Sequence, residues 1–324
     1  MIIKTYEINY IDINPNLIEL YKEAFFIDIE STGLSRAYSD IISITFLLYE
    51  EEGYKIYQIF CEYKIDEQQA LKYLKDIIAQ KKYIITYNGN SFDLPFLEHK
   101  IQNYKLNFNF SNFNKIDIYS LVRQLKPKIQ CNDFKLKTVE KYFNINRNDT
   151  LSGKDIITLY EAFKIEPRKE FSSLILQHNY EDVCNLPILF SHIINLYDNV
   201  LFYDNLIIYV LSDNFTIKKN TLLCRYSVVS SDKTNYIHNN INFNINIDSK
   251  TSIIELKIPL EFYSDDKIKE FFFIDNNNYN MNSYSIIEGI KKNLIPVKFN
   301  DTVFNNNIIN IIKHILDNIF KSKK

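Results

Sequence analysis

The sequence predicts an α/β protein, with a mixed sheet flanked by helices over the first 200 residues and a β-rich region from there to residue 324. Three apolar, β-branched segments separated by short turns occupy 24–61, which is typical of an antiparallel meander. Helix-like and strand-like segments then alternate, a pattern typical of a sheet with helices on its faces. Beyond residue 200, alternating apolar and polar residues between Asn- and Asp-rich turns indicate antiparallel strands.

The sheet is expected to form around the apolar run 24–30, which a strand-like piece and a helical turn at 16–22 precede. The next two strands are predicted at 41–49 and 54–61, because both are apolar and Glu50-Glu51-Glu52-Gly53 between them is a hairpin-turn sequence. Two shorter strands are expected at 83–87 and 115–118.

Apolar residues spaced three and four apart predict the helices. In 66–80 these residues are Ala70, Leu71, Leu74, Ile77 and Ile78. Further helices are expected at 92–102, 119–125, 135–142 and 155–163, with one longer helix over 170–196. In the β-rich region, strands are expected at 222–229, 241–247 and 252–262, and an amphipathic helix at 308–320.

Length and composition indicate a globular protein of two domains. The chain has 324 residues, of which 46% are apolar, and we expect one domain over 1–200 and a second over 201–324. The net charge of -2 supplies no overall positive field for non-specific binding of nucleic acid, although it allows an enzyme with a local groove.

The cysteines and the apolar runs indicate the cellular setting. Cys61, Cys131, Cys184 and Cys224 lie far apart without a Cys-x-x-Cys pattern, so we expect reduced thiols and neither a zinc site nor disulfides. No apolar run approaches the roughly 18 residues of a membrane span, and the first residues lack the pattern of a signal peptide. We therefore expect a soluble, cytoplasmic protein.

Two carboxylates, Asp28 and Glu30, interrupt the first apolar strand. Side chains two residues apart on a strand point to the same face. Two acids held together at an apolar strand end are unfavourable unless a positive charge lies between them, and a hard divalent cation is the usual one. The alternative is a strand end that frays into water, with both acids solvated.

Two later segments carry further acids. Asp93 follows a predicted turn and starts a helix, where Asp is also favoured as a cap or first-turn residue. His178 and Asp182 are four residues apart, so on a helix they share a face, with a surface contact as the alternative. Together with Asp28 and Glu30, Asp93 and Asp182 could hold two hard cations about 4 Å apart, the arrangement for in-line displacement at phosphate.

Asp117 ends the strand predicted at 115–118. We interpret it first as a cap of the following helix. A supporting position beside the metal ligands is the alternative.

The acids lie in three longer motifs, Phe26-Ile27-Asp28-Ile29-Glu30-Ser31-Thr32-Gly33-Leu34, Asn88-Gly89-x-x-Phe92-Asp93-Leu94-Pro95-Phe96-Leu97 and His178-Asn179-x-x-Asp182. In this order they resemble the three motifs of the DEDD exonucleases of the ribonuclease H-like superfamily, the third in the form used by the YprB-like branch. Arg147 and Gly153 match an Arg and a Gly that this branch tends to carry before its last helices. Each motif is weak alone, and together they are specific.

The resemblance covers roughly residues 20–200 and implies a five-stranded mixed sheet with the acids at one end of its central strands. It also implies a two-metal 3′–5′ exonuclease acting on DNA or RNA. By the match of motifs, Asp28, Glu30, Asp93 and Asp182 bind two Mg²⁺ or Mn²⁺ ions, and His178 is the general base.

The position of His178 departs from the family pattern. In the exonucleases that use a His base, that residue lies one position further from the last Asp, and the spacing found here accompanies a Tyr base. Tyr180 is only two residues from Asp182 and lies on another side of the predicted helix. An imidazole with an ordinary pKa near 6.5 would suit removal of a proton from water.

Substrate contacts are expected near the first two motifs and on one basic stretch. In the resembling enzymes the residues that follow the two acids of the first motif pack near the terminal nucleotide, which implies Thr32, Gly33 and Leu34, and Asn88 could contribute a hydrogen bond. Residues 123–142 carry Arg123, Lys126, Lys128, Lys135, Lys137 and Lys141 with two aromatic residues among them. That stretch could line a groove for nucleic acid or form an ordinary solvated face.

We interpret the chain as a two-metal 3′–5′ exonuclease whose partner is a nucleic acid with a 3′ end. Two alternatives stay open: a structure-specific endonuclease on the same fold, and a non-catalytic scaffold that binds nucleic acid. No chemical motif is found in the β-rich C-terminal region.

Overall fold

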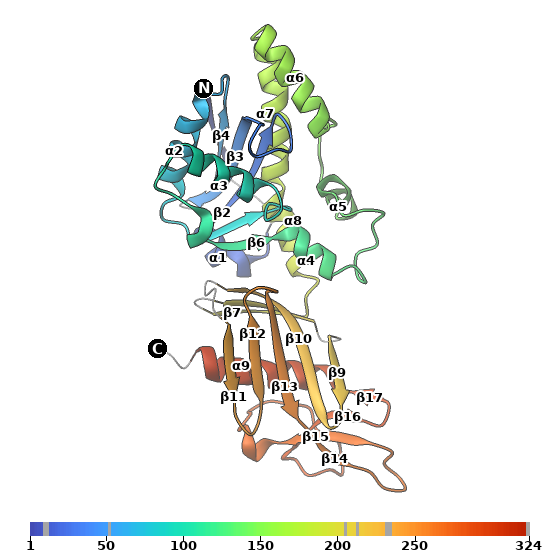
Figure 1. The fold of residues 1–324 in the computed structure, drawn as a ribbon. Helices are drawn as coiled ribbons and strands as arrows, with labels where there is room; N and C mark the ends of the chain where they lie inside the picture. Colours follow the sequence, from blue (N-terminus) through green and yellow to red (C-terminus); the bar gives the residue numbers. More distant parts are fainter. Residues whose placement is uncertain (9–12, 51–52, 204–205, 212–213, 231–234, 322–324) are drawn as a thin grey trace. The chain divides into compact units, whose positions relative to one another are not determined.

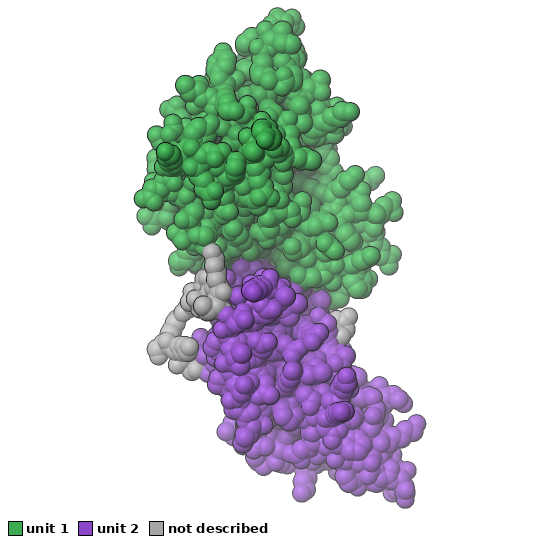
Figure 2. All heavy atoms as spheres, viewed as in Figure 1, with its two compact units in different colours: residues 1–196 green, residues 197–324 purple. Residues whose placement is uncertain are grey.

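The computed structural model describes the whole chain except residues 9–12, 51–52, 204–205, 212–213, 231–234 and 322–324. The chain forms two compact units, Met1–Leu196 and Tyr197–Lys324, which Figure 2 distinguishes by colour. Each unit is described by itself below. No helix of the described residues is long and apolar enough to cross a membrane.

The first unit is built on a mixed sheet of six strands in the order β1-β4-β3-β2-β5-β6. The strands are β1 (Ile2–Ile8), β2 (Ala24–Ser31), β3 (Ile41–Glu50), β4 (Gly53–Phe60), β5 (Tyr83–Thr86) and β6 (Asn114–Asp117). Pairing is antiparallel from β1 to β2 and parallel from β2 through β5 to β6. The expected mixed sheet is confirmed, and it gains a sixth strand because β1 pairs with β4 along its whole length.

Helices cover both faces of this sheet (Figure 1). They are α1 (Ile18–Lys22), α2 (Asp66–Ile78), α3 (Asp93–Asn103), α4 (Ile118–Gln124), α5 (Leu136–Tyr142), α6 (Gly153–Ile165), α7 (Lys169–Cys184) and α8 (Leu186–Ile194). Phe25, Ile27 and Ile29 of β2 pack in one core with residues of α2 and α3. Since neighbouring strand residues face opposite sides, Asp28 and Glu30 point to the other face, where α7 lies against β2.

The long helix predicted over 170–196 is wrong, because α7 ends at Cys184 and α8 begins at Leu186. Pro187 stands at the start of α8. A proline has no N–H to donate and its ring clashes with the carbonyl four residues earlier, so one continuous helix cannot pass through this position. The expected turn at 50–53 includes residues 51 and 52, which lie outside the described residues.

The second unit is β-rich, as predicted, and is organised around two antiparallel sheets. The larger has the order β11-β12-β13-β10-β8-β7 with β9 beside β10, and the smaller has the order β14-β15-β16-β17. The larger sheet contains β7 (Asn199–Tyr203), β8 (Leu206–Val210), β9 (Phe215–Lys218), β10 (Thr221–Ser230), β11 (Tyr236–Asn239), β12 (Asn244–Asp248) and β13 (Ile253–Pro259). The smaller contains β14 (Glu261–Tyr263), β15 (Phe271–Asp275), β16 (Leu294–Phe299) and β17 (Thr302–Val303).

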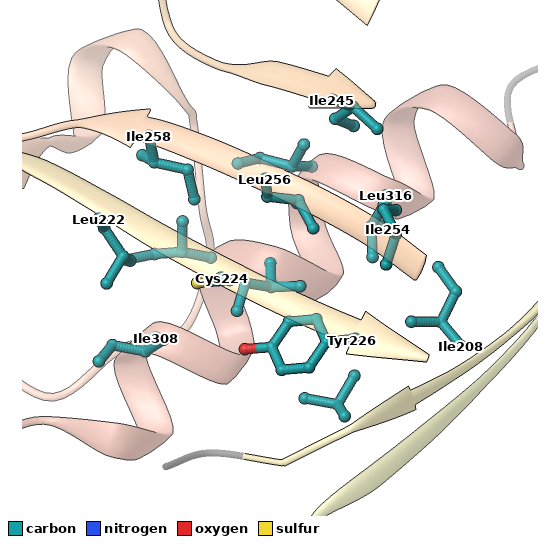
Figure 3. Close-up of a cluster of buried hydrophobic side chains, with 14 of the residues drawn as sticks. Ile208, Leu222, Cys224, Tyr226, Ile245, Ile254, Leu256, Ile258, Ile308 and Leu316 are labelled. Carbon is teal, nitrogen blue, oxygen red and sulfur yellow. The ribbon is translucent and has the colours of Figure 1, made fainter. Parts of the chain in front are cut away.

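The terminal helix α9 (Asn305–Phe320) completes the core of the second unit. In Figure 3, Leu222 and Tyr226 of β10 lie in one buried cluster with Ile308 of α9. Two expected strands need correction. The strand predicted over 252–262 is divided into β13 and β14 after Pro259, and the one predicted over 241–247 starts only at Asn244.

Candidate active site

The first two acids lie at the end of β2 with their carboxylates on the face that α7 covers. Asp28 lies opposite Thr45 and Glu30 opposite Ser43 of β3, and a register shift follows Glu30. The strand is therefore regular up to both acids and irregular directly after them. The expected shared face of Asp28 and Glu30 is present.

A buried polar chain holds Asp28. The fully buried amide of Asn179 in α7 donates from Nδ2 to Asp28 Oδ2 at 2.7 Å. Its oxygen accepts hydrogen bonds from Ser43 Oγ at 2.9 Å and Thr45 Oγ1 at 2.6 Å. Gln58 Nε2 donates to Thr45 Oγ1 at 3.0 Å, so three strands and α7 together fix the orientation of one carboxylate.

His178 and Asp182 share one face of α7, as their spacing predicts, and in the structure this face meets Glu30. His178 Nε2 lies 3.2 Å from Glu30 Oε1 and 3.5 Å from Asp182 Oδ2. One ligand atom from each of Glu30, His178 and Asp182 lies within 4.8 Å of the others, which is close enough for all three to bind one cation.

Asp93 joins the group from α3, in whose first turn it lies. Its side chain is buried, and Oδ1 accepts a hydrogen bond from the backbone N–H of Ile29 at 3.1 Å. Ile29 separates Asp28 from Glu30 along β2, so this bond ties the second motif directly to the first. The structure thus brings Asp28, Glu30, Asp93, His178 and Asp182 together from three distant segments. We call these five residues the acid group.

Too little positive charge lies near the carboxylates of this group to offset their burial and mutual repulsion. Desolvation, with repulsion from Asp93, Asp182 and Glu30, raises the pKa of Asp28 well above its ordinary value. Burial raises the pKa of Asp93 to about 7, although its backbone hydrogen bonds oppose the shift. Burial also raises the pKa of Glu30 against the opposing hydrogen bond from His178. Carboxylates whose ionised forms are disfavoured in this way suit hard divalent cations, which prefer oxygen ligands.

Asp149 is a site residue that the sequence analysis missed. Its side chain is almost fully buried, and Oδ2 lies 2.7 Å from His178 Nδ1 and 2.8 Å from Lys137 Nζ. Although burial acts in the opposite direction, these two hydrogen bonds hold the pKa of Asp149 below its ordinary value. An ionised Asp149 accepts the proton of Nδ1, while Nε2 of His178 faces Glu30 and Asp182.

His178 is protonated at neutral pH in the metal-free protein, contrary to the expectation of an ordinary pKa. Burial alone would lower the pKa of its imidazole, but the hydrogen bond to Glu30 and the charges of Asp182 and Glu30 raise it to about 9. Asp149 adds to the shift through its own hydrogen bond.

Arg147 supplies a fixed positive charge beside the acids. Its guanidinium donates to Glu140 Oε2 at 2.8 Å and to Asp182 Oδ1, and Nε lies 3.5 Å from Asp149 Oδ2. Glu140, like Asp149, was not identified from the sequence, because neither residue belongs to a motif. Gly153, the other branch-specific residue, begins α6 and has open space where a Cβ would stand.

Asp117 has the structural role that was preferred for it. It caps α4 by accepting from Tyr119 N at 3.0 Å, and it also accepts from Asn88 N at 2.8 Å and Asn90 N at 3.2 Å. Asn88 has a positive φ of 63°, and a Cβ on Gly89 would stand 2.5 Å from Cβ of Thr86. Asp117 and Gly89 therefore shape the turn that leads to Asp93.

The residues after β2 form a closed loop. Thr32 N donates to Asp40 O at 2.9 Å, and Asp40 N donates to Thr32 Oγ1 at 2.8 Å. A Cβ on Gly33 would stand 2.9 Å from Ser39 Oγ, so a larger residue there would require the hydroxyl of Ser39 to move. Leu34 is 84% exposed and contributes an apolar side chain four residues from Glu30. Tyr180 of α7 packs edge-on against Tyr6 and is not part of the acid group.

Comparison with known proteins identifies one family. The model of the RNase H superfamily matches residues 25–194, which include all five grouped residues. No curated protein sequence matches the chain.

Two solved structures share part of the shape. A family B DNA polymerase from the hyperthermophilic archaeon Pyrobaculum calidifontis is 14% identical, with a TM-score of 0.42 over 52% of this chain and 24% of the polymerase. The apo form of a nuclease is 16% identical, with a TM-score of 0.35 over 56% of this chain and 77% of that one. The chain thus spans about a quarter of the polymerase.

Proposed function

Since the chain belongs to the RNase H superfamily, we propose that it is a metal-dependent 3′–5′ exonuclease that hydrolyses phosphodiester bonds of DNA or RNA. One observation carries the proposal. Four acids and a histidine from three separate segments meet at one end of the sheet, and desolvation raises the pKa of Asp28, Glu30 and Asp93.

We propose that Asp28, Glu30, Asp93 and Asp182 hold two divalent cations, Mg²⁺ or Mn²⁺. Bound cations would lower the pKa of the attacking water and offset the charge on the phosphate oxygens. The protein's part is to keep the four carboxylates in place. Asn179 does so for Asp28, the backbone of Ile29 for Asp93 and Arg147 for Asp182.

His178 is proposed as the general base. The water oxygen forms a bond to phosphorus, the bond from phosphorus to the 3′ oxygen breaks, and the water proton passes to Nε2 of His178. The imidazole must first lose the proton that Glu30 and Asp182 stabilise. Positive charge beside these two acids would weaken that stabilisation and bring the pKa of His178 toward the value a base needs.

The terminal nucleotide is proposed to lie against the loop after β2 and the turn after β5. The exposed side chain of Leu34 offers an apolar contact for a base. Thr32 and Gly33 maintain the loop, and Asn88 stands at the turn that leads into α3.

A scaffold without turnover is disfavoured by the cost of the site. Buried carboxylates that repel one another destabilise the fold, and a protein that only binds nucleic acid does not need them. An endonuclease on the same fold would use the same acids, so the products must distinguish it.

The test is a cleavage assay on single-stranded DNA and RNA labelled at the 5′ end, with Mn²⁺ and with chelator. An exonuclease shortens the labelled strand one nucleotide at a time, and Asp28→Asn should abolish the ladder. Internal fragments without intermediate lengths would indicate an endonuclease. No cleavage of any substrate in Mn²⁺ would contradict the proposal.

A further inference from the structure

The acid group cannot attract nucleic acid by itself, because it is an anionic centre and the substrate is a polyanion. A positive surface must lie nearby. One stretch, which we call the basic segment, covers residues 114–148 and contains α4 and α5. It has eight basic residues, Lys115, Arg123, Lys126, Lys128, Lys135, Lys137, Lys141 and Arg147, and three acidic ones, Asp117, Asp133 and Glu140, in a chain of net charge -2.

Five of the eight basic residues of the segment are exposed, while two of its three acids are buried. Arg123, Lys126 and Lys141 are exposed, and none of the three contacts a carboxylate among the described residues. Asp117 and Glu140 are buried and committed to Asn88 and Arg147, which leaves Asp133 as the exposed acid of the segment. The exposed face is therefore strongly positive.

The basic segment is attached to the acid group at both ends. At the first end, Asp117 holds the turn at Asn88 and Asn90, just before Asp93. Arg123 lies six residues beyond Asp117 on α4, about 9 Å away at the rise of an α-helix. At the other end, Glu140 binds Arg147, which binds Asp182. Lys141 is the next residue after Glu140.

A third attachment holds the middle of the segment. The hydroxyl of Tyr87, at the end of β5, donates to the carbonyl of Phe134, and its ring packs edge-on against Tyr119 with 5.8 Å between centroids. Figure 1 shows α4 and α5 beyond the β6 edge of the sheet. The three attachments hold α4 and α5, which carry these positive side chains or adjoin them, close to the second and third motifs.

We propose that Arg123, Lys126 and Lys141 form a track that binds the phosphodiester backbone of a single-stranded nucleic acid and leads it to the acid group. Tyr142, beside Lys141, is 41% exposed and provides a ring on which a base can stack. Cations that follow the backbone and aromatic rings that take any base are the features of sequence-independent single-strand binding. This inference rests on the proposed nuclease function, because the track is proposed to lead substrate to the acid group.

The track is tested by binding, in chelator, where no metal-dependent cleavage can occur. Fluorescein-labelled dT and rU 20-mers and a blunt hairpin duplex are titrated with the full chain, and anisotropy gives Kd at several salt concentrations. The test variant is Arg123→Gln/Lys126→Gln/Lys141→Gln. The matched control, Lys72→Gln/Lys154→Gln/Lys169→Gln, removes three exposed cations from α2, α6 and α7 of the same unit.

The test variant should bind both single strands more weakly, and the slope of log Kd against log salt should fall by about 2, since each phosphate contact contributes about 0.7 for single strands. The control should keep the slope of the wild type. DNA and RNA should respond alike because the track contacts phosphates, and the hairpin should bind less tightly than either single strand.

Several results would overturn the track: an unchanged slope in the test variant, an equal loss in the control, no binding by the wild type, or tighter binding of the hairpin than of either single strand. Its failure is distinguishable from failure of the nuclease proposal. If the wild type cleaves in Mn²⁺ but the test variant keeps the salt slope of the wild type, only the track is refuted. If the test variant and the control show the predicted slopes but the wild type never cleaves, only the nuclease proposal is refuted.

Discussion

His178 connects the acids to the proposed chemistry, since its Nε2 faces Glu30 and Asp182 while Asp149 holds its Nδ1. We predict that His178→Ala lowers kcat by about 10²–10⁴-fold, the usual contribution of a general base. Mn²⁺ affinity measured by calorimetry should change little, because the four acids remain. His178→Tyr should retain more activity than His178→Ala, with its pH dependence shifted to higher pH.

A different result would give His178 another role. The three ligand atoms of Glu30, His178 and Asp182 lie close enough to share one cation. If His178→Ala weakens Mn²⁺ binding as strongly as it lowers kcat, the imidazole is a metal ligand. If both variants behave like the wild type, His178 is neither base nor ligand.

The pKa shifts of Asp93 and His178 predict how the stability of the metal-free protein depends on pH. Asp93 has a pKa of about 7 in the fold against 3.8 ordinarily, so the folded state binds its proton more tightly and loses stability as pH rises from about 4 to 7. His178 has a pKa of about 9 against 6.5, so its contribution is complete below 6.5 and is lost as pH rises to about 9.

Both shifts have the same sign, and Tm in chelator should therefore fall continuously between pH 5 and pH 9. Asp93→Asn should flatten the curve below pH 7, and His178→Ala should flatten it above. Thermal melts in a series of buffers measure this. A Tm that rises across this range would contradict the assigned environment of both groups.

Four of the site residues that the sequence predicted are under a periodic constraint. Asp28 and Glu30 share a face because strand side chains alternate, and His178 and Asp182 share one because they are one helical turn apart. Asp149 lies in the stretch between α5 and α6, where no period relates a residue to its neighbours in space. Only the folded chain brings it to His178. For the same reason the pKa of His178 could not be predicted, since it depends on Glu30, Asp149 and Asp182 together.

At the scale of the elements, the turn between β5 and α3 determines where Asp93 stands. We predict that Gly89→Ala destabilises the protein by about 1–3 kcal/mol, because the new Cβ would overlap the buried side chain of Thr86. Activity should fall further than stability explains, since the turn leads to Asp93.

Gly153→Ala is the matched control. A Cβ there meets open space at the first position of α6, and alanine favours a helix over glycine by up to about 1 kcal/mol. Denaturant unfolding of both variants should show a loss for Gly89→Ala and no loss for Gly153→Ala. Equal stabilities would contradict the packing described at Thr86.

Most elements of the first unit were predicted because each combines a periodic apolar pattern with a turn signal at its ends. The helix over 170–196 was predicted wrongly because its apolar pattern continues through the break. Pro187, close to the break, was the sequence signal that one continuous helix does not form there. The place of β1 in the sheet was not predicted for another reason. It comes from pairing with β4, which no local sequence pattern shows.

At the scale of the whole molecule, we propose that the first unit carries the chemistry. All residues of the acid group and of the basic segment lie within Met1–Leu196, which has its own cores. A fragment ending at Tyr197 should keep metal-dependent cleavage and bind substrate more weakly. A folded fragment that cleaves nothing would show that the second unit contributes to the active site.

The central claim is that Asp28, Glu30, Asp93 and Asp182 bind divalent cations, and it is tested most directly by Tm with and without Mn²⁺ for the wild type and for Asp28→Asn. Without metal, the variant should be as stable as the wild type or slightly more so, because one of several mutually repelling carboxylates is neutral. Mn²⁺ should raise the Tm of the wild type by mass action and raise that of the variant less. An equal rise in both proteins would contradict a cation site at these acids.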